Sequence, residues 1–279
     1  MALGSSALPA LPPLMLAPAG ITGRYLREML PSFLPPTLLT GAGINPERLA
    51  RDELYRVPLY QVQALLEQVL RAVPDPLFAL RQTRGLSLKA YPWLGASLLA
   101  SVDLRTGLER LIELEPLVWD GSRIELSQQG EQACLRWIEL QPLPPAMVEM
   151  ALAGWILLAP TLAQVPAGEV RLHFRHAARA PLEAYEAVLG CRPQFDQPDI
   201  SLHFPAAWLT RAMTHSDPTA GEWLLAEARR RLAEGPETWL LESRVRALCL
   251  GRLPGELPEA AAIAQELAMT PRVLRDRLQ

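Results

Sequence analysis

The feature that most constrains the fold is a long apolar segment, MVEMALAGWILLAPTLAQV, at residues 147–165. A segment of this length either crosses a membrane or lies buried inside a folded domain. Glu149 and Pro160 interrupt it and no cationic flank follows, so the sequence favours burial and predicts no membrane association. We therefore predict a helix at residues 145–164 in a packed core. A composition of 49% hydrophobic and 20% charged residues supports such a core.

The segments beside this helix alternate between apolar and polar residues, which is typical of half-buried strands. SRIELS and QACLRWIEL flank the polar turn QQGE and predict an antiparallel hairpin. EVRLHFRH places Val170, Leu172 and Phe174 on one face, with Arg171, His173 and Arg175 on the other. DISLHFP predicts another strand, and PLEAYEAVLG between them predicts a short helix closed by Gly190.

The N-terminal third of the chain has the spacing of helices. The pattern of residues 20–72 is helical, with GINPERLARDELYRVP as a loop and short-helix segment that has Asn45 and Pro46 as its start signal. Asp103 is a predicted N-cap for a helix that runs to about residue 115. Together with the strands, this order predicts a mixed α/β (α+β) N-terminal domain, followed by an all-α helix–turn–helix segment.

Changes in pattern predict four regions. Residues 1–19 are expected to be a flexible tail, and residues 20–212 a first domain of mixed α/β structure. Residues 213–235 are expected to form a linker helix capped by Ser216 or Asp217. Residues 236–279 are helical in pattern, with one helix at 237–253 and a closing pair after it.

Charge and cysteine content limit the classes of protein. A net charge of −3 gives no overall basic excess, so only a local face is available for DNA. The cysteines Cys134, Cys191 and Cys249 form no CxxC pair, which argues against a disulfide framework or a structural zinc site. We expect these cysteines to be free, buried thiols in a reducing cytosol.

Three histidines, His173, His176 and His203, raise the question of a metal site. Two of them occupy matching His-Phe pairs in predicted strands, so they are expected near each other on adjacent strands. We see no acidic or cysteine partner beside them in the sequence and predict a polar strand face, with no metal and no cofactor.

The chain ends in a predicted helical pair, AAIAQELAMTPRVLRDRL. Ile263 and Leu267 are one turn apart and are expected to face Leu274 and Leu278 across the turn. Thr270 is a good N-cap, and proline is well suited to the next position. The residues left to contact bases and phosphates are Thr270 itself, Arg272, Val273, Arg275, Asp276 and Arg277.

This pair, read with the preceding SRVRALCLGRLPGELPEA, resembles the first helix–turn–helix unit of AraC/XylS-type transcriptional regulators. The matches are Ile263, Ala264, Leu267, Met269, Thr270, Pro271, Arg272, Leu274 and Leu278. The upstream stretches GINPERLARDELYRVPLYQVQALLEQVLRAVPDPLFAL, YPWLGASLLASVDLRTGLERLIELEPLV and VRLHFRHAARAPLEAYEAVLGCRPQFDQPDISLHFPAAWL resemble the arabinose-binding-type, non-cupin N-terminal domain of that family. The resemblance extends over roughly residues 25–279.

The resemblance implies a cytoplasmic bacterial regulator without catalytic activity. Its first domain would sense a small molecule and mediate homodimerisation, and its closing helices would bind double-stranded promoter DNA. Asp276 departs from the family, which often has arginine there; a carboxylate repels phosphate but accepts from cytosine. Family members carry a second helix–turn–helix, so we expect this chain alone to bind DNA weakly and with strong salt dependence.

An effector pocket needs apolar walls and a few charged anchors, and arginine would suit a carboxylate. The candidates are Tyr91, Trp93, Trp119, Arg136, Trp137, Arg171, His173, Arg175 and Tyr185.

Two other classes remain open. One is a ligand-sensing dimerisation module that does not bind DNA usefully in this form. The other is an α/β enzyme, which is disfavoured because the sequence has no G-x-S-x-G elbow and no Gly-rich phosphate loop.

Overall fold

The structure, a computed structural model, describes residues 20–30, 34–52, 55–73, 75–119, 121–234, 245, 259–267 and 269–278. The predicted tail at 1–19 lies outside the described residues, as does the predicted helix at 237–253 apart from Val245. The chain divides into two compact units: Gly20–Ala233, and a second that contains Glu234–Gln279. Each unit is described by itself below. The predicted mixed α and β fold is confirmed.

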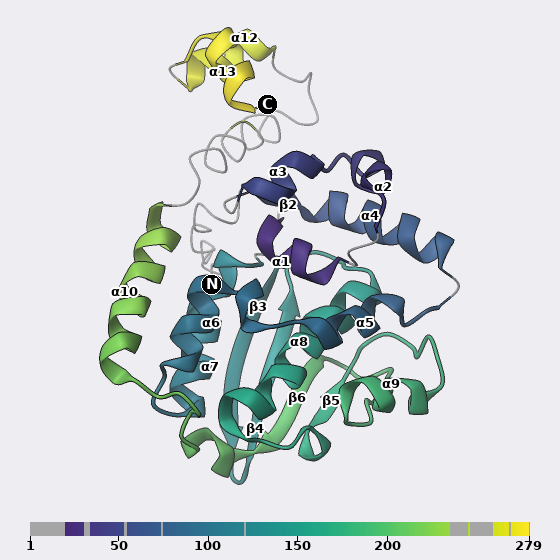
Figure 1. The fold of residues 1–279 in the computed structure, drawn as a ribbon, viewed down its shortest axis with the longest axis vertical. Helices are drawn as coiled ribbons and strands as arrows, with labels where there is room; N and C mark the ends of the chain where they lie inside the picture. Colours follow the sequence, from purple (N-terminus) through teal and green to yellow (C-terminus); the bar gives the residue numbers. More distant parts are fainter. Residues whose placement is uncertain are drawn as a thin grey trace, which may run out of the picture. The chain divides into compact units, whose positions relative to one another are not determined.

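The first unit begins with helices and a small two-stranded sheet (Figure 1). Strand β1 (Gly20–Thr22) pairs antiparallel with β2 (Arg56–Pro58), a small sheet that the helical pattern predicted for residues 20–72 does not include. These strands are only three residues long, too short for an alternating pattern to reveal them. The helices of this region are α1 (Gly23–Met29), α2 (Pro36–Gly41), α3 (Pro46–Arg51), α4 (Leu59–Ala72) and α5 (Phe78–Gln82).

Several helix starts follow from local side-chain chemistry. Asn45 accepts hydrogen bonds from the backbone N–H groups of Glu47 and Arg48 at 3.0 Å each, which confirms the predicted start of α3. Asp103 accepts from the N–H of Thr106 at 2.9 Å and caps α7 (Leu104–Leu114). Between these regions lie the 3-10 turns η2 (Thr83–Gly85) and η3 (Leu88–Ala90) and the helix α6 (Pro92–Leu99).

A four-stranded antiparallel sheet forms the second half of the unit, in the order β3-β4-β6-β5. The predicted hairpin is confirmed: β3 (Ser122–Gln129) pairs with β4 (Gln132–Glu139) around Gly130, whose φ of 58° suits the first position of a two-residue hairpin turn. β6 (Ile200–Pro205) pairs with β4 and with the short edge strand β5 (Arg171–His173). α9 (Leu182–Leu189) ends at the left-handed Gly190, as predicted.

The apolar segment forms α8 (Pro145–Ala163), close to its predicted bounds. Within the described residues it is the one helix that is long and apolar enough to cross a membrane, but 56% of its most apolar window is buried inside the protein. Pro160 is accommodated in its last turn, and Gln164 ends it in a left-handed conformation. The apolar character of α8 is thus explained by core packing.

Helix α10 (Pro218–Glu234) runs beside α6 and α7 in Figure 1. Arg110 on α7 donates to Glu222 of α10 at 2.9 Å, and Arg229 of α10 forms an ion pair with Glu113 of α7. α10 covers most of the predicted linker segment 213–235 and is capped by Asp217, which accepts from the N–H of Ala220 at 3.0 Å. Its role as a linker stays a prediction.

The second unit contains the helices α12 (Ala260–Glu266) and α13 (Pro271–Leu278), which pack on each other (Figure 1). Their shared core is formed by Ile263, Ala264, Leu267 and Leu274, with Val245 and Met269 packed against it. The predicted inward faces are therefore confirmed, except that the side chain of Leu278 lies outside the described residues.

Candidate functional site

An apolar cavity of about 100 Å³ lies among the helices of the first unit. Its walls come from α1, α6, α7 and α8, with single contributions from loops. The lining residues are Tyr25, Leu88, Tyr91, Leu94, Leu98, Leu104, Gly107, Leu108, Leu111, Glu115, Val118, Trp119, Ala151, Trp155, Leu158, Ala159, Leu162 and Met213. An apolar cavity of this kind stays dry or takes an apolar guest.

Helical spacing builds the walls of this cavity. Leu104, Leu108 and Leu111 follow one another at four- and three-residue steps and so share one face of α7. Opposite them, Ala151 and Ala159 on α8 carry only a methyl group toward the same space. The cavity therefore exists because small side chains stand where larger ones would fill the core.

Two tyrosines stand at one end of the cavity. The rings of Tyr25 and Tyr91 lie 5.2 Å apart and are tilted by 56°. Burial raises the pKa of Tyr25 to about 12 and raises the pKa of Tyr91 well above its ordinary value. Both side chains therefore remain neutral phenols at physiological pH. A Cβ at Gly154 would approach the Tyr91 hydroxyl to 2.9 Å, so a larger residue there would displace the Tyr91 side chain.

Besides the tyrosines, the polar side chains of Glu115 and Trp119 belong to the cavity wall, and they differ in their hydrogen bonds. The carboxylate of Glu115 accepts from Ser122 Oγ at 2.9 Å and from Trp137 Nε1 at 3.3 Å. The indole N–H of Trp119 is buried and has no hydrogen-bond partner among the described residues. Buried donors are rarely left unpaired in folded proteins. This N–H lies beside Gly121, 3.2 Å from where a Cβ on that residue would stand, and the carboxylate of Glu115 is already hydrogen-bonded.

The nine pocket candidates from the sequence do not form one group. Tyr91 and Trp119 line the cavity. Trp137 lies behind the wall, with its ring 6.0 Å from that of Trp119. Trp93 lies beneath the guanidinium of Arg231, which is 4.2 Å from its ring centre.

Tyr185 belongs to a separate buried cluster. Its hydroxyl donates to Glu149 Oε1 at 2.9 Å, and Arg179 forms an ion pair with the same carboxylate. Glu149 is fully buried, and these contacts provide the pairing that a buried charge requires. The cluster explains how the apolar helix α8 tolerates a glutamate.

The remaining four candidates lie on the solvent-facing side of the four-stranded sheet. Arg136 and Arg175 are more than half exposed and form ion pairs with Asp199 and Glu139. Arg171 donates to Gln132 at 2.9 Å. They stand apart from the cavity because alternate residues of a strand point to opposite faces.

Most of the cavity lining was missed by the sequence reasoning, including Leu108, Trp155 and Met213. The signal that identifies Leu108 is the helical stripe of α7, which predicts burial but not the presence of a cavity. Met213 comes from a loop after β6, and only the tertiary fold brings it to α7, where its methyl lies near Gly107.

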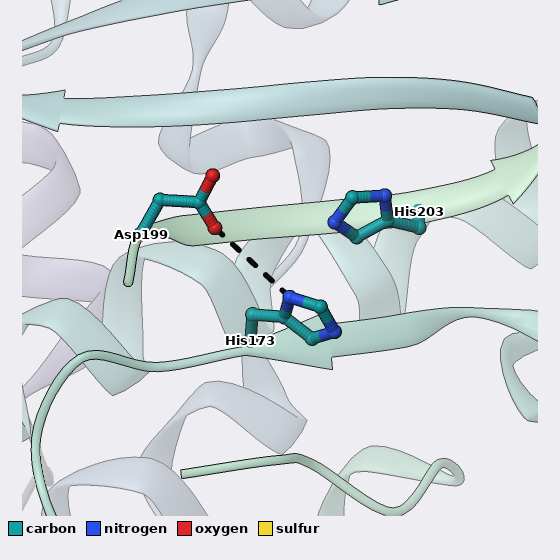
Figure 2. A group of neighbouring side chains, drawn as sticks. All are labelled: His173, Asp199 and His203. Atoms are coloured by element: carbon teal, nitrogen blue, oxygen red, sulfur yellow. Dashed lines mark ion pairs between the residues drawn. The ribbon is translucent and has the colours of Figure 1, made fainter. Parts of the chain in front are cut away.

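On the same outer face, His173, Asp199 and His203 come together (Figure 2). His173 Nδ1 lies 4.0 Å from Asp199 Oδ1, and the two imidazole rings are 4.6 Å apart. The expectation that the two histidines are neighbours is confirmed. The expectation of no acidic or cysteine partner nearby in the sequence does not extend to space, because Asp199 stands beside His173 and Cys134 Sγ lies 4.0 Å from His203 Nε2.

The protonation of this cluster follows from its surroundings. Burial lowers the pKa of His173, against the opposing effect of Asp199. Burial also lowers the pKa of His203, with further contributions from His173 and Arg171. Both imidazoles are therefore neutral near neutral pH.

In the second unit, α13 presents charged side chains to solvent. Thr270 Oγ1 accepts from the N–H of Val273 at 3.2 Å, as expected of an N-cap. The side chains of Arg272 and Asp276 are 91% and 65% exposed and lie 4.0 Å apart. Val273 and Arg275 are exposed as well, whereas the side chain of Arg277 lies outside the described residues.

Comparison with protein families identifies the family of this chain. Residues 34–213 match the family described as the arabinose-binding domain of AraC transcription regulators, N-terminal. The ornithine utilization regulator of Pseudomonas aeruginosa is 28% identical over 207 residues, which make up 73% of this chain and 61% of that protein. The chain thus spans less than two thirds of the length of that curated relative.

A solved structure supports the fold. The transcriptional regulator CdpR of Pseudomonas aeruginosa is similar with a TM-score of 0.55 and 17% sequence identity, over 91% of this chain and 78% of that chain. The family match itself covers well over half of the chain. The chain therefore belongs to the AraC-type transcription regulators that carry the arabinose-binding N-terminal domain.

Proposed function

We propose that the unit Gly20–Ala233 senses a small, largely apolar effector in the cavity between α6, α7 and α8, and that the helix pair α12–α13 contacts DNA. The observation that carries the first half is the apolar cavity itself, lined mainly by leucine, alanine and aromatic side chains. An apolar ligand site with few, well-placed polar groups is the usual form of a small-molecule pocket.

The lining defines the class of effector. A guest that fits has a largely apolar body. The name of one relative links that protein to ornithine utilization. Ornithine carries two ammonium groups and a carboxylate, and burying such charges without partners is very costly. Glu115 is committed to Ser122 and Trp137, so we expect the effector of this chain to be uncharged over most of its surface.

A thermal-shift titration with phenol, hexanoate and ornithine tests this class. Phenol is expected to raise the Tm by a few degrees in a saturable manner, because a ligand that binds only the folded state stabilises it. Ornithine is expected to have no effect. The substitution Ala159→Leu adds carbon atoms to the cavity wall and should abolish the phenol response. Ala207→Leu, at an exposed position in the turn η6 (Ala206–Thr210), is the matched control.

Two results would refute the sensing site. One is an equal phenol shift in the wild type and in Ala159→Leu, because binding would then be elsewhere. The other is a shift with ornithine and none with phenol, because the apolar lining would then not select the ligand.

For DNA contact we propose Thr270, Arg272, Val273, Arg275, Asp276 and Arg277. The support is the exposure of α13, with Arg272 at 91%, and the family to which the chain belongs. Binding of a fluorescent duplex is measured between 50 and 200 mM salt. Arg272→Ala should reduce the salt slope by about one unit. Arg192→Ala, an exposed arginine of the first unit, should leave the slope unchanged.

The remaining expectations rest on the family alone. We propose a cytoplasmic regulator that acts as a homodimer, and that strong DNA binding requires a second helix–turn–helix unit. Sedimentation equilibrium checks the dimer. Comparing the affinity of this chain with that of a chain extended by a second unit checks the requirement, and equal affinities would contradict it.

A further inference from the structure

We propose that His173, Asp199 and His203 form a binding site for a divalent transition-metal ion of the Zn²⁺ class on the outer face of the four-stranded sheet. The site is separate from the cavity, and it does not depend on the proposed effector. Figure 2 shows the three side chains gathered where β5 and β6 run side by side.

The spacing of the ligand atoms suits one small ion. One nitrogen from each histidine and one carboxylate oxygen all lie within 4.8 Å of one another. Ligands held at about 2.0–2.2 Å from tetrahedral zinc are about 3.4 Å from each other. Side-chain rotations that move the ligand atoms by about an ångström therefore complete the site without movement of the strands. The side chains of His173 and Asp199 are 19% and 29% exposed, so an ion can reach them from solvent.

The sheet fixes the backbone beneath these ligands. Ser201 on β6 pairs with His173 on β5, and His203 pairs with Cys134 on β4. Because β6 is hydrogen-bonded on both sides, the relative positions of the two histidines are set by the ladder. This is the kind of rigid support that a precise site needs.

A buried hydroxyl orients the carboxylate. Ser201 is fully buried, and its Oγ donates to Asp199 Oδ1 at 2.8 Å. Ser201 Oγ also lies 3.0 Å from His203 Nε2, and an ion bound at that nitrogen would replace this contact. Partners that hold a ligand in place are a regular part of metal sites.

The donor types select the class of ion. Two imidazoles and one carboxylate suit zinc, cobalt, nickel or copper and not magnesium or calcium, which prefer oxygen ligands throughout. The thiol of Cys134, 4.0 Å from His203 Nε2, adds to this preference as a neighbour of soft character. A fourth position remains for that thiol or for water.

Two arginines act against a cation here. Arg136 Nε lies 3.4 Å from Asp199 Oδ2 and competes with the ion for that carboxylate. Arg171 stands opposite His203 in the ladder and is held by Gln132. The site should therefore bind more weakly than a closed structural zinc site, and its affinity should depend on Arg136.

The test is a Zn²⁺ titration of the whole chain in competition with a chromophoric chelator, repeated with Co²⁺ by absorbance. One equivalent is expected to bind, with no competition from Mg²⁺. His173→Ala and His203→Ala should each weaken binding by about tenfold or more. His215→Ala removes an exposed histidine outside the cluster and should bind like the wild type. Circular dichroism establishes that each variant is folded.

A second variant separates a metal site from an ordinary polar face. Arg136→Gln should tighten Zn²⁺ binding by about two- to fivefold, because this range in affinity corresponds to the free energy of an exposed ion pair. Two results would overturn the proposal: folded His203→Ala that binds Zn²⁺ as tightly as the wild type, or Arg136→Gln that leaves the affinity unchanged or lower.

Discussion

The two sides of the four-stranded sheet carry side chains of opposite character on the same strands. Trp137 lies on the inner side, buried against Trp119 of the cavity wall, while its neighbour Arg136 lies in solvent and pairs with Asp199. The inner side is apolar and belongs to the packed core, and the outer side is polar and gathers titratable groups. One residue along a strand therefore separates the core beside the cavity wall, at Trp137, from the polar face that carries the proposed metal site.

The two sides also differ in how strongly a charged side chain depends on its hydrogen-bond and ion-pair partners. Inside, the carboxylates of Glu115 and Glu149 are retained only with several donors around each. Outside, Asp199 divides its contacts between Arg136, Ser201 and His173 and keeps access to water. Buried charges depend on their partners far more than exposed ones do, and this difference ranks the following expectations.

The largest effect is expected for Arg179→Ala. It removes the cationic partner of the fully buried Glu149 and should lower the free energy of unfolding by about 3–5 kcal/mol. Urea denaturation measures the loss. Adding Glu149→Gln to this variant should restore part of it, because a neutral amide needs no counter-ion. A loss below about 1 kcal/mol would show that the inner side tolerates unpaired charge.

The next effect is expected for Leu111→Ala on the cavity wall. Leu111 is 6% exposed, and its truncation should cost about 2–5 kcal/mol through lost burial and an enlarged cavity. The variant should also show an altered phenol response in the thermal-shift titration. If its unfolding curve matched that of the wild type, the cavity wall would be a loose surface and not part of the core.

An intermediate effect is expected at alkaline pH. Burial raises the pKa of Tyr25 to about 12, above that of an unfolded tyrosine near 10. The stabilisation is fully present below about pH 10 and is lost as the pH rises toward 12, by up to about 1.4 kcal/mol per pH unit. Stability of the wild type and of Tyr25→Phe is compared across this range. The phenylalanine variant should lose less, and identical slopes would contradict a buried, neutral Tyr25.

The smallest effect is expected on the outer side. Arg175→Gln removes a 62% exposed side chain whose ion pair with Glu139 spans 3.7 Å. Its unfolding free energy should stay within about 0.5 kcal/mol of the wild type. A larger loss would remove the contrast between the two sides of the sheet.

The sequence predicted features that depend on local periodicity and capping. The alternation of EVRLHFRH placed Leu172 and Phe174 inside and Arg171 outside, and Asp103 and Thr270 cap the helices that follow them. These rules act over a few residues, so no knowledge of the tertiary fold is needed.

What depends on distant parts of the chain was not predicted. The pairing of β1 with β2 joins Ile21 to Val57, and short strands of this kind leave no pattern. The cavity needs Tyr25, Leu108 and Met213 to meet, and helical spacing in one segment cannot show that the facing segment carries alanine. Aromatic and arginine residues are the pocket candidates that the sequence offers. Strand alternation directs four of the candidates outward, to the face opposite Trp137.

The most direct test of the central claim, an apolar effector cavity, is nuclear magnetic resonance of the chain with bound phenol and labelled methyl groups. Intermolecular NOEs are predicted from the phenol ring to the methyl groups of Met213 and Leu111, which face the cavity from a loop and from α7. The Ala159→Leu variant should show none. Phenol that binds with NOEs only to residues outside the cavity would contradict the account.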